Sequence, residues 1–433
     1  MIKRILFEGP VQSTSGYGSR TRDLALSLKD NENYEVYIYP MSWGRTPDTG
    51  LDQLSEDDRT WILQRIDSIK DVKDKTIDVF VKVGLPSEFR RVGKFNIGVT
   101  AGIETDQCNP AWIHNINESV DLCLVSSNWS KHVLSKTKVY QNNKLAGEIE
   151  ATTPIEVLFE GINTNVFNGT YTKTSFSETL DNIPERFVFL NVGHWLPGEV
   201  THDRKDISGT IISFLDTFKV PVGKKKHMPA LVLKCGVNNS VKEVEAFQAK
   251  IQPLKEFFVK EFTLPNVYLL NGSFSNEEMN ELYMHPKVKC MYSLTKGEGY
   301  GRPFLEFSTT GKPIIAPYHT GFTDFMLLND GLFEVKSELV KIHESAVVKD
   351  ILLPYSQWMD SDYASGVQLL KKMYKEYNNY STHKQKYHSL TNFNKKKMSE
   401  LFDFYIDTYV PKHETITLPK EFTPTPKEVP TLV

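Results

Sequence analysis

Short apolar runs alternate with amphipathic stretches along most of this chain. In the first 161 residues, runs typical of strands occupy residues 4–9, 34–41, 78–84, 95–102, 121–127 and 155–161. Between the first two runs, Leu24, Ala25 and Leu28 share one face of a predicted helix. Further helices are predicted around residues 110–119 and 127–136. Such alternation is typical of a mainly parallel sheet covered by helices.

A polar stretch at residues 168–185 interrupts this rhythm, and we interpret it as the connection between two domains. The alternation then restarts, with strand-like runs at residues 186–193, 230–236, 266–272, 288–294 and 312–318. We therefore predict an α/β protein with two Rossmann-like, doubly wound domains that face each other across a cleft. The expected limits are 1–180 and 181–385, followed by a helix at 386–413 that packs back on the N-terminal domain and a proline-rich tail at 414–433.

Length and composition narrow the possible classes of protein. The 433 residues are too many for one compact core and suit two domains. Lys and Arg total 51 against 54 Asp and Glu, a balance that argues against a general nucleic-acid-binding protein. The four cysteines lack CxxC spacing and are expected to be reduced thiols. No run approaches the ~20 apolar residues of a membrane span, so we expect no stable membrane insertion and a cytoplasmic location (host cytoplasm if phage-encoded).

The most informative segment is SLTKGEGYGRPFLEFSTTGKPIIAPYHTGFTDF, residues 293–325. It places Glu298 in a glycine-rich turn after a predicted strand, and Glu306 eight positions later. Pro303 indicates that a helix begins between them, because proline is favoured at the first position of a helix. Free amides at such a helix start favour an anion such as a diphosphate. Glu306, one helical turn after this start, can accept hydrogen bonds from a ribose diol. Glu298, in the glycine-rich turn before the helix, can reach the hydroxyl groups of the sugar.

The run GEGYGRPFLE resembles the E-x7-E signature of retaining glycosyltransferases with the GT-B fold, in particular glycosyltransferase family four. Other segments resemble further parts of that family in the same order: residues 15–28, 101–134, 155–167 and 189–207. Each motif alone is weak, but their order extends over roughly 300 residues. The resemblance implies transfer of a sugar from a nucleoside-diphosphate sugar to a hydroxyl, with retention of the anomeric configuration.

The resemblance also implies a role for individual residues. Lys205, Arg204 and Glu298 would be catalytic, because the two cations stabilise the leaving diphosphate and the carboxylate lies near the sugar. The remaining donor-binding positions are the loop residues Gly16, Tyr17 and Gly18, the residue His194, the turn residues Gly299, Tyr300 and Gly301, and the ribose-binding Glu306.

The chain departs from the family pattern mainly on the acceptor side. His194 replaces the family's arginine, so Arg204 and Lys205 would carry more of the phosphate charge. The histidine common after the fourth strand is absent, and Glu104 and Asp106 stand there instead. Asp324, which follows a small glycine turn, is the third acceptor-side candidate. The identities of sugar, nucleotide and acceptor therefore stay open, as does the oligomeric state.

Several readings of the function remain. The acceptor would be an envelope glycan, a lipid precursor or a modified phage DNA base. No cofactor beyond the nucleotide-sugar donor is expected, and no metal, because Arg204 and Lys205 supply positive charge. Asp360 and Asp362 mimic a metal-binding DxD but precede a helical stretch, where N-capping is the simpler use. The alternatives are a sugar-nucleotide epimerase or phosphorylase of the same fold, or a non-catalytic module that binds sugar nucleotides.

Overall fold

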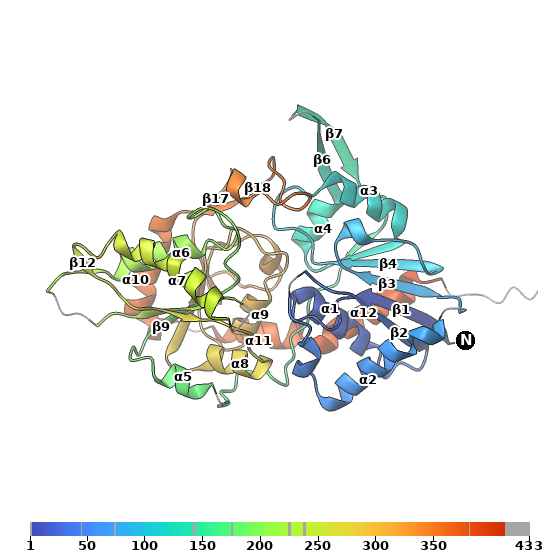
Figure 1. Ribbon diagram of the computed structural model, residues 1–433, viewed down its shortest axis with the longest axis horizontal. Coiled ribbons are helices and arrows are strands. Elements are labelled where there is room, and N and C mark those ends of the chain that lie inside the picture. Colours follow the sequence, from blue (N-terminus) through green and yellow to red (C-terminus); the bar gives the residue numbers. More distant parts are fainter. Residues whose placement is uncertain are drawn as a thin grey trace, which may run out of the picture.

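The computed structural model describes residues 2–411 except 45, 73–74, 142–143, 175, 224–226, 237–239 and 381. The predicted tail at 414–433 lies outside the described residues. The chain folds around two separate six-stranded sheets, one in each half, with helices packed around them (Figure 1). This arrangement confirms the predicted α/β class with two Rossmann-like units.

The N-terminal sheet is parallel throughout and has the strand order β2-β1-β3-β4-β5-β8. Its strands are β1 (Lys3–Gly9), β2 (Tyr34–Pro40), β3 (Val79–Val83), β4 (Phe95–Thr100), β5 (Leu122–Val125) and β8 (Ile155–Val157). The associated helices are α1 (Gly16–Ser27), α2 (Glu56–Asp67), α3 (Pro110–Ser119) and α4 (Asn128–Ser135). β3 and β4 are buried along their whole length, as expected for central parallel strands covered on both faces.

The C-terminal sheet is also parallel and has the order β13-β11-β9-β14-β15-β16. Its strands are β9 (Val188–Val192), β11 (Ala230–Lys234), β13 (Val267–Leu270), β14 (Val288–Tyr292), β15 (Ile314–Ala316) and β16 (Leu332–Glu334). The helices of this half are α5 (Ser177–Asp181), α6 (Ile207–Phe218), α7 (Val241–Glu256), α8 (Asn276–Met284), α9 (Arg302–Ser308) and α10 (Tyr363–Glu376). Short strands β10 (Val220–Pro221) and β12 (Phe262–Thr263) pair beside this sheet.

The order of the second sheet fixes where a ligand would bind. Sequential strands run outward from β9 on one side and from β14 on the other, so the topology reverses between these two neighbours. Doubly wound sheets bind their ligands outside the carboxyl ends of the strands at this switch point. The loops after β9 and β14 are therefore the first place to look for the site.

The end of the chain returns from the C-terminal half to the N-terminal half. Helix α11 (His383–Asn392) is followed by α12 (Lys395–Tyr409). Met398, Phe402 and Ile406 recur at intervals of four and join the hydrophobic cluster of β1, β3 and α1. Ile162, which follows β8, exchanges backbone hydrogen bonds of 2.9 and 3.0 Å with Phe393 and Lys395, so the chain crosses between the halves twice at one place.

Two hairpins were not predicted from the sequence. β6 (Lys136–Gln141) pairs with β7 (Lys144–Glu150) and projects from the N-terminal half, and β17 (Ser337–Lys341) pairs with β18 (Gln357–Ser361) on the facing half (Figure 1). The segment between β17 and β18 bridges the halves. Ile342 and Leu352 of this segment, together with Trp358 of β18, belong to the same hydrophobic cluster as Trp112 and Ile113 of α3. The two halves thus share a core beside the β17–β18 hairpin.

One local expectation was wrong. Gly16, Tyr17 and Gly18 form the first turn of α1, not a loop, because the Ser15 side chain caps the helix by accepting from the Gly18 amide at 3.0 Å. Arg204 and Lys205 lie just before α6, whose N-cap residue Asp206 accepts from the Gly209 amide at 3.0 Å.

Candidate functional site

The loops that leave β9 and β14 lie side by side at the switch point. The Lys296 amide donates to the Arg204 carbonyl at 2.8 Å, which ties residues 293–301 to the segment before α6. Asp206 caps α6 with a left-handed backbone, at φ 44°, so the chain turns sharply after Lys205. These two contacts explain why residues 93 positions apart can meet here.

A cluster of two cations and two carboxylates occupies this place. The Lys205 Nζ forms an ion pair with Glu298, whose Oε1 also accepts from the Thr295 hydroxyl at 2.9 Å. The Arg204 Nη1 lies 2.9 Å from Glu104 Oε1 and donates to the Gly297 carbonyl at 2.9 Å. Glu104 belongs to the N-terminal half, following β4, so the cluster spans the boundary between the two halves. All four side chains are at most about a fifth exposed.

The opposite charges of the cluster stabilise one another in their ionised forms. Burial alone would raise the pKa of Glu298, but the charges of Lys205 and Arg204 outweigh burial and hold that pKa below its usual value. Burial lowers the pKa of Lys205, and the neighbouring Glu298 carboxylate opposes that shift. An ionised Glu298 beside two cations can accept hydrogen bonds from hydroxyl groups but is a poor nucleophile.

Glu306 lies in a second charged group at the base of the same loop. Its carboxylate accepts from the Tyr283 hydroxyl at 3.2 Å and lies 3.6 Å from the Arg302 Nε. The Arg302 guanidinium also lies 3.6 Å from Asp23 and 3.8 Å from Glu160, both in the N-terminal half. Burial raises the pKa of Glu306, although Arg302 opposes the shift. Arg302 is thus the cation that these three carboxylates, Asp23, Glu160 and Glu306, share.

Arg302 is the site residue that the sequence analysis missed. Its buried Nη1 makes no hydrogen bond to the described residues, although it lies within ion-pair distance of Asp23 and Glu160. Within the described part of the chain, the Tyr300 hydroxyl and the two ring nitrogens of His319 also lack a hydrogen-bond partner. Buried polar atoms without partners are costly, and they mark places where a ligand can supply the missing bond. The signal was present, since Arg302 lies inside the GEGYGRPFLE run, but its contacts to Asp23 and Glu160 depend on the other half of the molecule.

The glycine-rich run after β14 is in close contact with the N-terminal half. The Gly299 carbonyl accepts from the Ser127 hydroxyl at 2.8 Å, and a Cβ on Gly299 would lie 2.8 Å from the Ala101 carbonyl oxygen. Gly301 has φ 93° and is the N-cap of α9, a backbone conformation that favours glycine. These glycines are therefore explained by packing and turn geometry alone, and their role toward a donor stays a prediction.

The predicted donor residues of α1 lie beside the end of β4. The Tyr17 hydroxyl lies 3.0 Å from the Thr100 hydroxyl and accepts from the Ala101 amide at 3.2 Å. Burial raises the pKa of Tyr17 to about 12, so it stays a neutral hydrogen-bonding group. A Cβ on Gly18 would lie 2.1 Å from the Ser13 carbonyl oxygen, whereas one on Gly16 would meet open space. Gly18 is thus required by packing.

His194 lies two residues after the end of β9 and is exposed. Desolvation by the surrounding protein, together with the nearby charges of Lys205, Lys234 and Arg204, lowers the pKa of His194 to about 4. The ring is therefore neutral near pH 7 and adds no positive charge. Arg204 and Lys205 therefore supply the positive charge of this cluster, with no contribution from His194.

The three acceptor-side candidates lie in different environments. Glu104 joins the cation cluster, as described above. Asp106 accepts from the Gln357 amide at 2.6 Å, and its own amide donates to the Gln357 carbonyl at 3.0 Å. Asp324 accepts from the Asn128 amide at 2.8 Å, at the first residue of α4. Asp106 and Asp324 therefore connect the two halves, and only Glu104 contacts the cations.

Two sequence features of metal or thiol chemistry have ordinary explanations in the structure. The Asp362 side chain caps α10 by accepting from the Ala364 amide at 2.9 Å, and Asp360 pairs with Lys296. Across the described residues there is no group of three or more metal-ligating side chains. The four cysteines are buried, free thiols.

The described helices include none with the length and apolar character needed to cross a bilayer.

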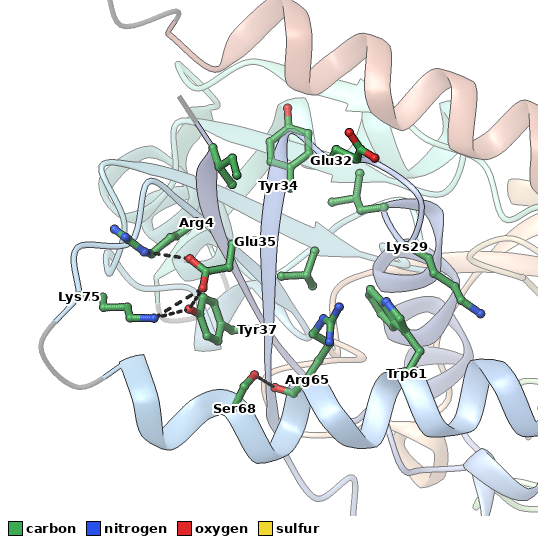
Figure 2. A pocket seen from close by; sticks show the side chains of 13 residues that line it. Arg4, Lys29, Glu32, Tyr34, Glu35, Tyr37, Trp61, Arg65, Ser68 and Lys75 are labelled. Atoms are coloured by element: carbon green, nitrogen blue, oxygen red, sulfur yellow. Dashed lines mark hydrogen bonds and ion pairs between the residues drawn. The ribbon is translucent and has the colours of Figure 1, made fainter.

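A separate pocket lies on the outer edge of the N-terminal sheet, along β2, away from the loops after β9 and β14 (Figures 1 and 2). Its charged groups satisfy one another. Arg4 Nε lies 3.1 Å from Glu35, which accepts from the Tyr37 hydroxyl at 2.5 Å, and Lys75 donates to that hydroxyl at 2.9 Å. Lys75 also lies 3.5 Å from Glu35, which is thus shared among three donors. Among the described residues, none that lines this pocket has a buried side-chain polar atom without a hydrogen-bond partner.

Comparisons with known proteins agree with the fold. No protein-family model matches the chain, and no curated protein matches its sequence. Among solved structures, HepE of Anabaena in complex with UDP-glucose is similar with a TM-score of 0.59 and 12% identity, over 94% of this chain and 99% of that one. A glycosyltransferase from Rickettsia africae has a TM-score of 0.60 at 12% identity, over 95% and 100% of the two chains.

Sucrose-phosphate synthase from Thermosynechococcus elongatus is similar to the same degree, with a TM-score of 0.60 and 12% identity over 94% of this chain and 99% of that one. At such identities the likeness concerns the fold. The chain has the two-domain GT-B fold of these glycosyltransferases.

Proposed function

We propose that this protein is a glycosyltransferase that uses a nucleoside-diphosphate sugar as donor. The observation that carries the proposal is the convergence of Lys205, Arg204 and Glu298 at the switch point between β9 and β14, where the fold binds ligands. The Anabaena relative in fold has been solved with UDP-glucose, which supports a nucleotide sugar as the ligand class.

In this proposal, Lys205 and Arg204 bind the diphosphate, Glu306 the ribose and Glu298 the hydroxyls of the sugar. As the glycosidic bond breaks, negative charge grows on the diphosphate oxygen, and preorganised cations stabilise it most at that moment. The acceptor hydroxyl oxygen forms the new bond to the anomeric carbon, the bond to the diphosphate oxygen breaks, and the acceptor proton passes to the leaving diphosphate.

Retention of configuration is part of the proposal. Retaining hydrolases use a carboxylate nucleophile, with the two carboxyl groups about 5–5.5 Å apart. Here Glu298 is bound to Lys205 and Thr295, an arrangement that favours attack on the same face as the leaving group over a covalent intermediate. The proposal is tested by incubating the protein with UDP-, GDP-, ADP- and TDP-sugars and candidate hydroxyl acceptors. Mass spectrometry should detect a glycosylated product, and donor epimerisation or phosphorolysis without transfer would contradict the proposal.

Replacing Glu306 by alanine should weaken binding of the nucleoside diphosphate by about 1–3 kcal/mol, because a charged hydrogen-bond acceptor for the ribose is lost. Isothermal titration calorimetry with the diphosphate measures this directly. Glu334→Ala, on the edge strand β16, is the matched control and should leave the affinity unchanged. Equal affinity of wild type and Glu306→Ala, with the fold intact, would remove the ribose assignment.

Turnover should survive chelation of divalent metals. The Lys205 and Arg204 cations take the place that a metal ion holds in metal-dependent transferases, and Asp360 and Asp362 are engaged with Lys296 and α10. We expect the initial rate in excess EDTA to match the rate without chelator. Loss of turnover in EDTA, restored by Mg²⁺ or Mn²⁺, would contradict this expectation.

A further inference from the structure

Arg204 is bound by a carboxylate that comes from the opposite half of the molecule. Glu104 lies in the loop after β4, and its Oε1 is 2.9 Å from the Arg204 Nη1. The same Nη1 donates to the Gly297 carbonyl at 2.9 Å. The two loops are in close contact, since a Cβ on Gly297 would lie only 2.4 Å from the Glu104 carbonyl oxygen. The Glu104 side chain is thus delivered directly to a cation that the proposed function assigns to the diphosphate.

The charges of the cluster balance as they stand. Lys205 and Arg204 contribute two positive charges, and Glu298 and Glu104 contribute two negative ones. A diphosphate that enters this largely buried cluster adds negative charge close to both carboxylates, and like charges within a few ångströms repel strongly where water is scarce. One carboxylate must therefore give up its cation when a diphosphate binds.

The two carboxylates are not equally free to move. Glu298 is held by Lys205 and by the Thr295 hydroxyl, and the backbone amide of Glu298 donates to the Thr320 hydroxyl at 3.0 Å. Glu104 reaches Arg204 across the boundary between the two halves, with its side chain 21% exposed against 10% for Glu298. Rotation of the Glu104 side chain toward solvent needs no change in the loop after β14. Glu104 is therefore the carboxylate that loses its ion pair when a diphosphate binds.

We propose that Glu104 is an internal competitor for the diphosphate at Arg204, and that donor binding releases it to accept a hydrogen bond from the acceptor hydroxyl. This inference rests on the proposed function. Glu104 belongs to the N-terminal half and Arg204 to the C-terminal half, so the released carboxylate stays at the boundary between the halves, next to the donor cations. It acts as a positioning group for the acceptor.

The test is a titration with UDP of wild type, Glu104→Gln, Arg204→Ala and the double variant. Glu104→Gln keeps the shape of the side chain and removes the competing charge, so we expect UDP to bind about 3- to 10-fold more tightly, the range for removal of one charge at a partly buried ion pair. In the Arg204→Ala background the same change should have no effect. Glu118→Gln, an exposed carboxylate on α3, removes an equal charge from the same half and should leave the affinity unchanged.

Transfer should respond in the opposite direction. With saturating donor, Glu104→Gln is expected to lower kcat about 10-fold while KM for the donor falls, a split that a purely structural role would not produce. If wild type binds GDP, ADP or TDP in place of UDP, the same four proteins are titrated with that diphosphate. If none of the four diphosphates binds wild type, the proposed function itself is wrong, and the inference is lost with it. If UDP binds wild type but equally or more weakly to Glu104→Gln, or if the tightening persists without Arg204, the donor site stands and the inference is overturned.

Discussion

Replacing Lys205 by alanine should lower kcat by about 10²-fold or more at saturating donor, in line with the loss of one preorganised charge stabiliser. The Lys205 ammonium pairs with Glu298 at the switch point, where charge would develop on the leaving diphosphate. A group that acts mainly in the transition state lowers kcat and kcat/KM together, whereas one that serves only ground-state binding mainly raises KM. Steady-state kinetics with varied donor separates the two.

Arg204→Ala is the companion variant and should have a smaller effect on kcat. The Arg204 guanidinium also donates to the Gly297 carbonyl at 2.9 Å, so less of its hydrogen-bonding capacity is directed at the donor. Lys205→Ala also leaves Glu298 with a weaker counter-charge, so Tm should be measured for each variant to separate loss of function from loss of fold. A Lys205→Ala protein that is folded and turns over at the wild-type rate would return Lys205 to a structural role.

Replacing Trp358 by alanine should destabilise the protein by about 3–5 kcal/mol, the usual cost of truncating a buried tryptophan. Trp358 is 3% exposed and belongs to the cluster that Ile342 and Leu352 form with Trp112 of the other half. The cavity would therefore weaken a core that both halves share. Urea denaturation followed by tryptophan fluorescence and far-UV circular dichroism gives the free energy of unfolding.

Leu339→Ala, on the neighbouring strand β17, is the matched control for Trp358. Its side chain is 50% exposed, so the change should cost less than about 0.5 kcal/mol. If Trp358→Ala were no more destabilising than Leu339→Ala, the bridging segment would be a surface attachment, and the two halves would not depend on it.

The repeating pattern of both sheets could be read from the sequence because each central strand is buried on both faces. Continuous apolar runs such as LCLV in β5 and ALVL in β11 follow directly from that burial. The β6–β7 hairpin has no such signature. β7 (KLAGEIE) is exposed along nearly its whole length and shows no regular alternation of apolar and charged residues, so its sequence is typical of a loop.

Only those features of the candidate site that depend on neighbouring residues in the sequence could be predicted. Glu298, Glu306 and the Arg204–Lys205 pair were marked by glycines and by a helix start, which are local features. The contacts of Glu104 with Arg204, and of Arg302 with Asp23, join residues from different halves of the chain. No spacing along the sequence reports such contacts, because they depend on how the two domains pack.

The central claim is that a nucleoside-diphosphate sugar binds between the loops that follow β9 and β14. Calorimetric titration of UDP-glucose, and then of GDP-, ADP- and TDP-glucose, into wild type and into the Lys205→Ala/Glu306→Ala double variant tests this claim most directly. We expect saturable binding of at least one donor to wild type, and affinity at least about 10-fold weaker in the folded double variant, the equivalent of roughly 1.4 kcal/mol. Absence of binding by every donor, or equal affinity for both proteins, would contradict the account.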